Sequence, residues 1–136
     1  MEQILMCVSA AIVFLLGTAH LYYTFVGDKL RPRNPAVLTA MEQDHPGLTR
    51  QTTMWRAWIG FNASHSLGAM LFGLIYSYLA LAQPALLFGS GFLLLVGASM
   101  LGGLAVLAVR FWFNIPRNGV FLALACYALS LLWGLR

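Results

Sequence analysis

The chain has 136 residues, of which 60% are hydrophobic and only 9% are charged, and its mean hydropathy is +0.79. These values exclude an ordinary water-soluble domain. The net charge of +4 does not indicate a nucleic-acid partner. The Lys and Arg residues fall in expected loops, at helix ends or at the C-terminus, and form no basic tract interleaved with aromatic residues. Long uncharged runs instead predict helices that cross a hydrocarbon core about 30 Å thick.

The first apolar run predicts a spanning helix over about residues 4–26. Met1-Glu2-Gln3, which precedes it, lacks the basic segment that begins a secretory signal peptide, so we expect the run to remain as a helix. A polar segment over residues 27–50 follows.

A short helix is expected inside this polar segment. Asn34 before Pro35 is typical of a helix N-cap followed by the first helical residue, and the helix should end near Gln43. Its apolar residues share one face, which favours a position along the membrane interface. These residues are Val37, Leu38 and Met41.

Three further spanning helices are expected over about residues 52–81, 85–109 and 119–135. Gln83-Pro84 separates the first two, and a turn at Asn114 to Asn118 separates the last two. The predicted fold is therefore an all-α membrane protein, a bundle of four transmembrane helices with one interfacial helix, in a single domain over residues 1–136.

The distribution of basic residues predicts the orientation. Seven of them fall on one side of the expected membrane and Arg136 falls on the other. The seven are Lys29, Arg31, Arg33, Arg50, Arg56, Arg110 and Arg117. Because Lys and Arg mark the cytoplasmic side, residues 27–50 and 111–118 should be cytoplasmic and both termini periplasmic or exterior. We therefore expect a multi-pass protein of a cell inner membrane.

Small residues predict where helices approach closely. The expected third helix carries the pairs Ala98/Gly102 and Ser99/Gly103, and the second carries the rows Gly60/Ser64/Gly68 and Ala69/Gly73/Ser77. Such spacing is typical of bundle packing or of dimerisation. The expected partners are therefore the lipid bilayer and either a second copy of the chain or a larger membrane complex. An oligomeric transporter or channel remains a further alternative.

A polar and aromatic stripe follows one face of the expected helix over residues 52–81. It comprises Trp55, Trp58, Asn62, His65, Ala69, Phe72 and Tyr76. An amide and an imidazole that faced lipid would each cost free energy, so Asn62 and His65 should face the bundle. At about 1.5 Å per residue, His20 lies about 9 Å inside the loop end of the first helix, and His65 about 13 Å inside Arg56. This depth allows the two histidines to meet.

Several interpretations of this stripe stay open. His20, Asn62, Ser64 and His65 could form an interhelical hydrogen-bond network. A lipid or small apolar ligand could bind among the same polar groups and nearby aromatic residues; these are Trp55, Trp58, Phe61, Tyr22 and Tyr23. His20 and His65 could also ligate a b-type haem or relay protons.

Other residue types limit the chemistry. The expected spans contain no Asp or Glu, which disfavours a proton-coupled transporter, a hydrolase or a di-iron site. Cys7 and Cys126 lie in apolar runs and are interpreted as small hydrophobic residues, so no metal site is predicted. Arg56, Arg110 and Arg117 are expected to reach lipid phosphates from helix ends, or to converge on one anionic headgroup.

Three segments resemble a group of small uncharacterised bacterial membrane proteins with four predicted helices. They are residues 50–68 (RQTTMWRAWIGFNASHSLG), 17–21 (GTAHL) and 111–117 (FWFNIPR). The resemblance spans most of the chain and implies a four-helix architecture in a bacterial inner membrane, but it implies no activity.

The leading functional hypothesis is a non-enzymatic membrane protein. It would act as an accessory subunit, or would bind a lipid or small apolar ligand where the first and second spanning helices meet. The alternative is a membrane enzyme or redox protein that uses His20 and His65.

Overall fold

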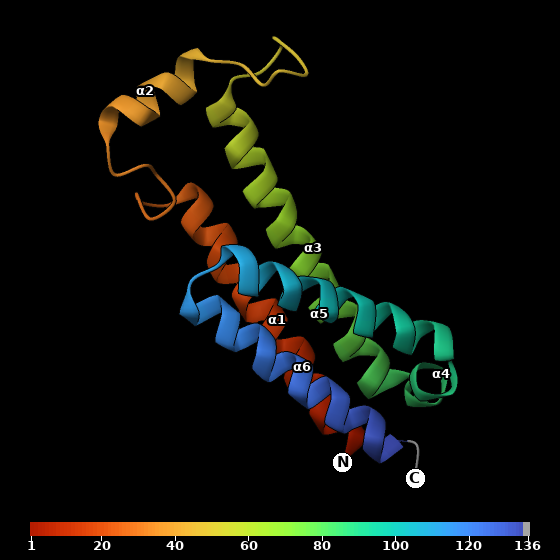
Figure 1. Cartoon of the computed structure of the whole chain (residues 1–136). Helices are drawn as coiled ribbons and strands as arrows, with labels where there is room; N and C mark the ends of the chain where they lie inside the picture. The colour runs from red at the N-terminus through yellow and green to blue at the C-terminus, as the bar shows by residue number, and fades with distance from the viewer. Residues whose placement is uncertain (135–136) are drawn as a thin grey trace. The chain divides into compact units, whose positions relative to one another are not determined.

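The structure, a computed structural model, describes residues 1–134, and within them it contains helices and no strand. The helices follow one another along the chain as Figure 1 shows. Their bounds are α1 (Glu2–Phe25), α2 (Pro35–Gln43), α3 (Met54–Ala82), α4 (Pro84–Gly89), α5 (Gly91–Phe111) and α6 (Asn114–Gly134). Arg136 and the expected end of the last helix at residue 135 lie outside the described residues.

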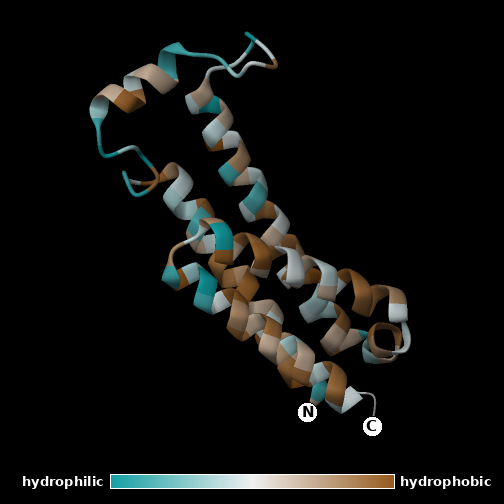
Figure 2. Cartoon of the chain, viewed as in Figure 1, coloured by the Kyte–Doolittle hydropathy of each residue, from teal (hydrophilic) through white to brown (hydrophobic). Residues whose placement is uncertain are grey.

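Four of these helices, α1, α3, α5 and α6, are long and apolar enough to cross a membrane. They correspond to the four expected spans, so the predicted fold class, an all-α chain with four helices of spanning length, is confirmed. Figure 2 shows hydrophilic residues gathered in the segments on either side of α2.

The short helix α2 begins and ends where its sequence predicts. The side chain of Asn34 accepts a hydrogen bond from the backbone N–H of Ala36 at 3.0 Å, which satisfies one of the donors at the helix start. At the other end Asp44 is extended, and its N–H donates to the carbonyl of Ala40. No residue of α2 is buried.

The third expected span differs from the prediction because it is interrupted near its start. Residues Pro84–Gly89 form α4, and Ser90 adopts an extended conformation (φ −105°, ψ 100°) before α5 begins. Two glycines flank Ser90, and glycine lowers the stability of a continuous helix. The Ser90 side chain accepts a hydrogen bond from the N–H of Leu93 at 3.3 Å, so Ser90 caps α5.

The prediction that the chain reverses at Asn114 to Asn118 is also wrong, because these residues are the start of helix α6. The chain reverses instead at Trp112 and Phe113. Pro116 is tolerated there because the first N–H groups of a helix have no partner inside the helix. A proline so close to the start therefore does not end the helix.

Two compact units make up the chain: a core unit, Met1–Leu16 with Ala69–Arg136, and a hairpin unit, Gly17–Gly68. Helices α1 and α3 contribute residues to both units. A single domain over residues 1–136 stays a prediction.

The core unit is held by close packing and by hydrogen bonds between helices. Gly73 lies against α1, because a Cβ added to it would be 2.6 Å from the Cβ of Phe14 and 2.7 Å from the carbonyl oxygen of Ala10. The hydroxyl of Ser9 donates to the carbonyl of Ala123 at 2.7 Å, which joins α1 to α6. The most buried large side chains of this unit are Met6, Val13, Leu87, Leu101 and Tyr127.

Of the small residues predicted to mark either bundle packing or dimerisation, Gly73 lies in a close helix contact within the bundle and four other glycines do not. A Cβ added at Gly60, Gly68, Gly102 or Gly103 would meet no atom within 4 Å. These four glycines therefore make no close helix contact within the described chain. Dimerisation through them stays a prediction.

Candidate functional site

His20 and Asn62 are joined by a hydrogen bond between α1 and α3 in the hairpin unit. Nε2 of His20 lies 2.8 Å from Oδ1 of Asn62, and Nδ2 of Asn62 donates to the carbonyl of Trp58 at 2.8 Å. Because a carbonyl can only accept, the bond to Trp58 fixes which end of the amide faces His20. Nε2 of His20 must therefore carry the proton and donate it to Asn62.

His65 lies beside this pair. The rings of His20 and His65 meet edge to face, with centroids 5.7 Å apart and an interplanar angle of 83°. The three polar residues expected to meet, His20, Asn62 and His65, are thus brought together. The interhelical hydrogen-bond network, one of the interpretations left open, would also include Ser64. Its exposed hydroxyl instead donates to the carbonyl of Phe61 on its own helix at 3.0 Å.

This arrangement does not suit haem ligation through Nε2 of His20. Histidine binds a metal through a ring nitrogen that carries no proton, whereas Nε2 of His20 is protonated and engaged with Asn62. Ligation through Nε2 would require that this hydrogen bond break. Among residues 1–134, no group of three or more His, Cys, Asp or Glu side chains could hold a metal ion.

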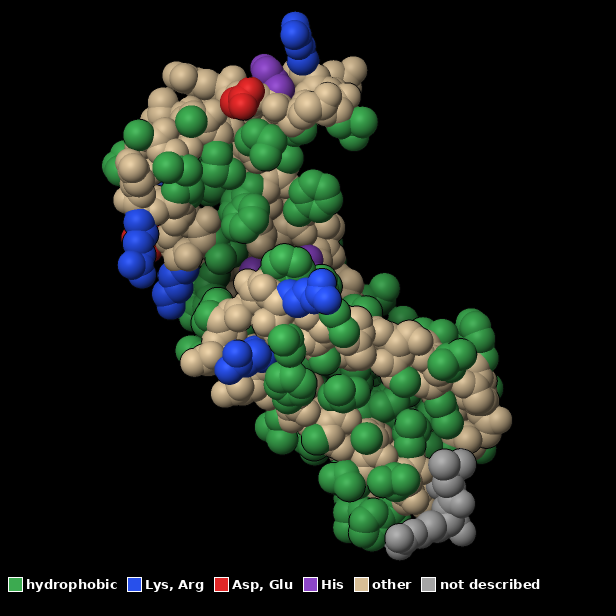
Figure 3. Space-filling view, viewed as in Figure 1, with side chains coloured by type: hydrophobic (Ala, Val, Ile, Leu, Met, Phe, Trp, Pro, Cys, Tyr) green, Lys and Arg blue, Asp and Glu red, His purple; other side chains and the backbone are tan. Residues whose placement is uncertain are grey.

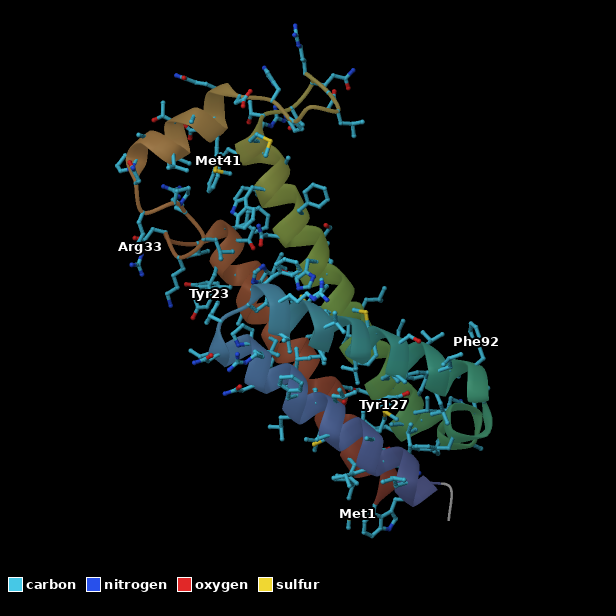
Figure 4. The ribbon with its side chains drawn as sticks, viewed as in Figure 1. Met1, Tyr23, Arg33, Met41, Phe92 and Tyr127 are labelled. Carbon is cyan, nitrogen blue, oxygen red and sulfur yellow. The ribbon has the colours of Figure 1, made fainter. Side chains whose placement is uncertain are left out.

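A cavity of about 200 Å³ lies in the hairpin unit, where α1 ends and α3 begins. Its walls combine aromatic and aliphatic side chains with one cation. They include Tyr23, Phe25, Leu30, Arg31, Trp55 and Ile59. In Figure 4, Tyr23 marks the loop end of α1, and Arg33 marks the segment that leads on to α2.

The loop that closes this cavity is fixed by backbone contacts. Gly27 has a φ of +83°, a conformation that only glycine adopts readily, and this lets the chain turn as it leaves α1. The N–H of Arg31 then donates to the carbonyl of Asp28 at 2.9 Å. The indole N–H of Trp58 donates to the carbonyl of Leu30 at 3.1 Å, so α3 holds the loop.

The two tryptophans of the predicted stripe therefore have different surroundings. Trp55 lines the cavity. Trp58, which is 42% exposed, positions Leu30 and with it the neighbouring Arg31. The sequence pattern placed both tryptophans on one face of the helix. It could not show that Trp55 lines the cavity whereas Trp58 anchors the loop.

Charged residues around the cavity have no acidic partners. Nζ of Lys29 lies 4.0 Å from the centre of the Tyr23 ring, a cation–π contact. Asp28, Glu42 and Asp44 form no ion pair with nearby basic residues, because in residues 1–134 the one ion pair joins the N-terminal ammonium group to Glu2 at 3.2 Å. Figure 3 shows Lys and Arg side chains exposed at the surface.

The three arginines predicted to bind an anionic headgroup belong to different units. Arg56 is exposed near the start of α3 in the hairpin unit, and it does not line the cavity. Arg110 in the last turn of α5 and Arg117 in the first turn of α6 belong to the core unit. Their convergence stays a prediction.

Three cavity residues were not predicted as site residues: Phe25, Leu30 and Arg31. A usable signal was present, since the aromatic end of α1 is followed by a glycine and then by alternating basic residues. Aromatic residues at a helix end with cations just beyond are typical of the headgroup level of a membrane.

Comparison of the chain with protein-family models, with curated proteins and with solved structures found no match. The resemblance to small four-helix bacterial membrane proteins therefore stays an expectation that rests on the three sequence segments.

Proposed function

We propose that this chain is a non-enzymatic integral membrane protein of a cell inner membrane that binds a lipid or small amphiphile at the cavity between α1 and α3. The observation that carries the proposal is the cavity itself, with apolar and aromatic walls and one guanidinium group. Mostly apolar walls with a few polar groups are usual for small-molecule sites.

The size of the cavity limits what it can hold. Its volume of about 200 Å³ is below the roughly 300–1,000 Å³ that enclose a drug-sized ligand. It therefore suits a headgroup or the end of a chain, while the rest of the ligand lies along the helices or in the surrounding bilayer.

The proposed orientation supports a ligand from the membrane. Most of the basic residues lie on the side where α1 ends and α3 begins, which is the cytoplasmic side by the positive-inside rule. The cavity would then lie at the level of lipid headgroups. Tyr23, Trp55 and Trp58 at this end of the helices are the aromatic residues expected at that depth.

The pair His20 and Asn62 would support the site rather than perform chemistry. Tyr23 and Thr24, which line the cavity, follow His20 by one helical turn. A hydrogen bond between α1 and α3 at this level keeps the two helices at a fixed spacing. The protonated Nε2 of His20 favours this supporting role over ligation.

The proposal is tested by filling the cavity. Leu30→Trp adds an indole to the wall, whereas Leu48→Trp makes the same change at a loop residue that is 95% exposed. Native mass spectrometry of each variant in mild detergent would measure retained lipid or amphiphile. We expect L30W to lose the ligand and L48W to keep it.

Two results would contradict the proposal. A wild-type protein that retains no ligand, and takes up none when lipid is added, would not be a binder. Equal retention by L30W and the wild type would place the ligand elsewhere.

A further inference from the structure

Arg31 is a cation on the wall of the cavity without a counter-ion. Its guanidinium group makes no ion pair or hydrogen bond in residues 1–134. Guanidinium offers five N–H donors in a planar arrangement that matches the oxygens of phosphate or carboxylate. The wall therefore presents a binding group that the protein itself does not use.

Two other donors on the same wall are also without partners. The indole N–H of Trp55 and the hydroxyl of Tyr23 make no hydrogen bond with the rest of the described chain. The hydroxyl hydrogen of Thr24 is already donated to the carbonyl of His20 at 2.7 Å. Unpaired donors thus predominate, and they fit a ligand that supplies acceptor oxygens.

Near the cavity, the positive charge that favours an anion comes from side chains and not from the backbone. Lys29 lies over the ring of Tyr23, so a second cation stands beside the aromatic wall. Against these, Asp28 lies in the same loop, and the last carbonyls of α1 carry a partial negative charge at this end of the helix. Without Arg31, the negative charge of Asp28 and of the α1 carbonyls would exceed the positive charge of Lys29. Arg31 is therefore the residue on which anion binding depends.

Resting on the proposed function, we infer that the ligand is an anionic amphiphile whose phosphate group is held by Arg31 and by the indole N–H of Trp55. Its apolar part then lies against Phe25 and Ile59, which line the same cavity. Free phosphate and a lipid headgroup both carry anionic phosphate oxygens, so these are the two sources of the group that Arg31 would hold.

The test uses the full chain in neutral detergent and three probes. These are a short-chain phosphatidylglycerol, the diacylglycerol with the same chains, which lacks the phosphate, and inorganic phosphate. We expect the wild type to bind the phosphatidylglycerol about tenfold or more tightly than the diacylglycerol, because a charge-assisted hydrogen bond to the phosphate contributes about 1.5–3 kcal/mol. Inorganic phosphate should not compete at equal concentration, since it lacks the apolar part.

Two substitutions assign the effect to the site. Arg31→Gln should remove the preference for the phosphate-bearing lipid and leave diacylglycerol binding unchanged. Arg33→Gln is the matched control, because it removes the same charge from an exposed residue of the same loop that does not line the cavity. Trp55→Phe keeps an aromatic wall without the N–H donor and should weaken phosphatidylglycerol binding severalfold.

The outcomes separate this inference from the proposed function. If the two lipids bind equally, or if R31Q and R33Q weaken binding equally, the inference is overturned while a lipid-binding cavity stands. If inorganic phosphate competes as well as the lipid does, the ligand is a soluble anion, and the inference of an amphiphile is overturned. If no lipid binds to the wild type, the proposed function itself fails.

Discussion

The side chains of His20 and Asn62 join α1 to α3 at 2.8 Å, in a bond whose direction is set by a second one from Asn62 to the carbonyl of Trp58. Nε2 of His20 and both ends of the Asn62 amide thereby have hydrogen-bond partners within the hairpin unit. In a bilayer, hydrogen bonds between helices contribute modestly to stability, about 0.6 kcal/mol on average. The value of this bond also lies in the fixed spacing that it gives the two helices beside the cavity.

Removing the amide should destabilise the protein. Asn62→Ala leaves Nε2 of His20 without its acceptor, and we expect a loss of about 1 kcal/mol in the free energy of unfolding. Unfolding in mixed micelles with increasing denaturing detergent would measure it. Asn118→Ala, an exposed asparagine in the first turn of α6, is the control and should change stability less. Equal effects of the two substitutions would show that the bond to His20 contributes nothing.

The role of His20 is tested by a residue that keeps its donor. Glutamine presents an amide N–H in place of Nε2–H, so His20→Gln should retain most of the stability, whereas His20→Leu should lose about as much as Asn62→Ala. If His20 instead ligated haem or moved protons, glutamine would abolish that role as completely as leucine. A Soret band in the purified protein that H20Q removes would refute the supporting role proposed for His20.

The meeting of His20, Asn62 and His65 could be predicted from the sequence because helix geometry sets both the face and the depth of a residue. The hydrogen bond of Ser64 could not, since a hydroxyl on a helix can bond to a carbonyl of its own backbone as readily as to a neighbouring helix. Arg31 was missed for another reason. Its place on the cavity wall depends on the turn at Gly27 and on the bond from Trp58 to Leu30, and neither leaves a periodic pattern in the sequence.

Helix bounds were predictable for similar physical reasons. Hydropathy located the four long helices, and the Asn34-Pro35 pair located the start of α2. The break at Ser90 was not expected because the flanking glycines scarcely lower the hydropathy of the run. The start of α6 was expected near residue 119 and lies at Asn114. Pro116 does not prevent this start, because it lies in the first turn, where no N–H is needed.

The packing of two tyrosines against Gly97 should make this glycine sensitive to substitution. A Cβ added to it would lie 2.8 Å from Cζ of Tyr127 and 2.8 Å from Cε1 of Tyr76. The hydroxyls of these tyrosines donate to the carbonyls of Leu94 and Leu93 on the same helix, so neither ring can withdraw without losing a hydrogen bond. Gly97→Ala should therefore cost about 1–3 kcal/mol.

Thermal unfolding in detergent would measure the effect of this substitution. Gly102→Ala is the control on the same helix, because its added Cβ would meet nothing within 4 Å, and it should leave stability unchanged or slightly raised. If both variants unfold at the wild-type temperature, the tyrosine contacts at Gly97 do not constrain the core unit.

The cap of α5 gives a further prediction. Ser90→Ala removes the oxygen that accepts from the N–H of Leu93, and the loss of such a cap typically costs about 1 kcal/mol. Ser99→Ala changes an exposed serine within the same helix and should have a smaller effect. Hydrogen exchange in the first turn of α5 would locate the change, which should appear as faster exchange at Leu93 in S90A and not in S99A. Unaltered exchange in S90A would show that the side chain of Ser90 does not hold the start of the helix.

The proposed orientation is tested by labelling single cysteines with a membrane-impermeant maleimide. In a background with Cys7 and Cys126 replaced by alanine, Leu48→Cys places a thiol in the loop between α2 and α3, and Gln83→Cys places one between α3 and α4. Helix α3 separates these positions and is long enough to cross the membrane, so the two thiols should be on opposite sides. The seven basic residues expected from the sequence on the side of Leu48 predict that L48C reacts in inverted vesicles and Q83C in intact spheroplasts. The reverse pattern would place the cavity on the exterior side, and labelling of both thiols from one side would mean that α3 does not cross.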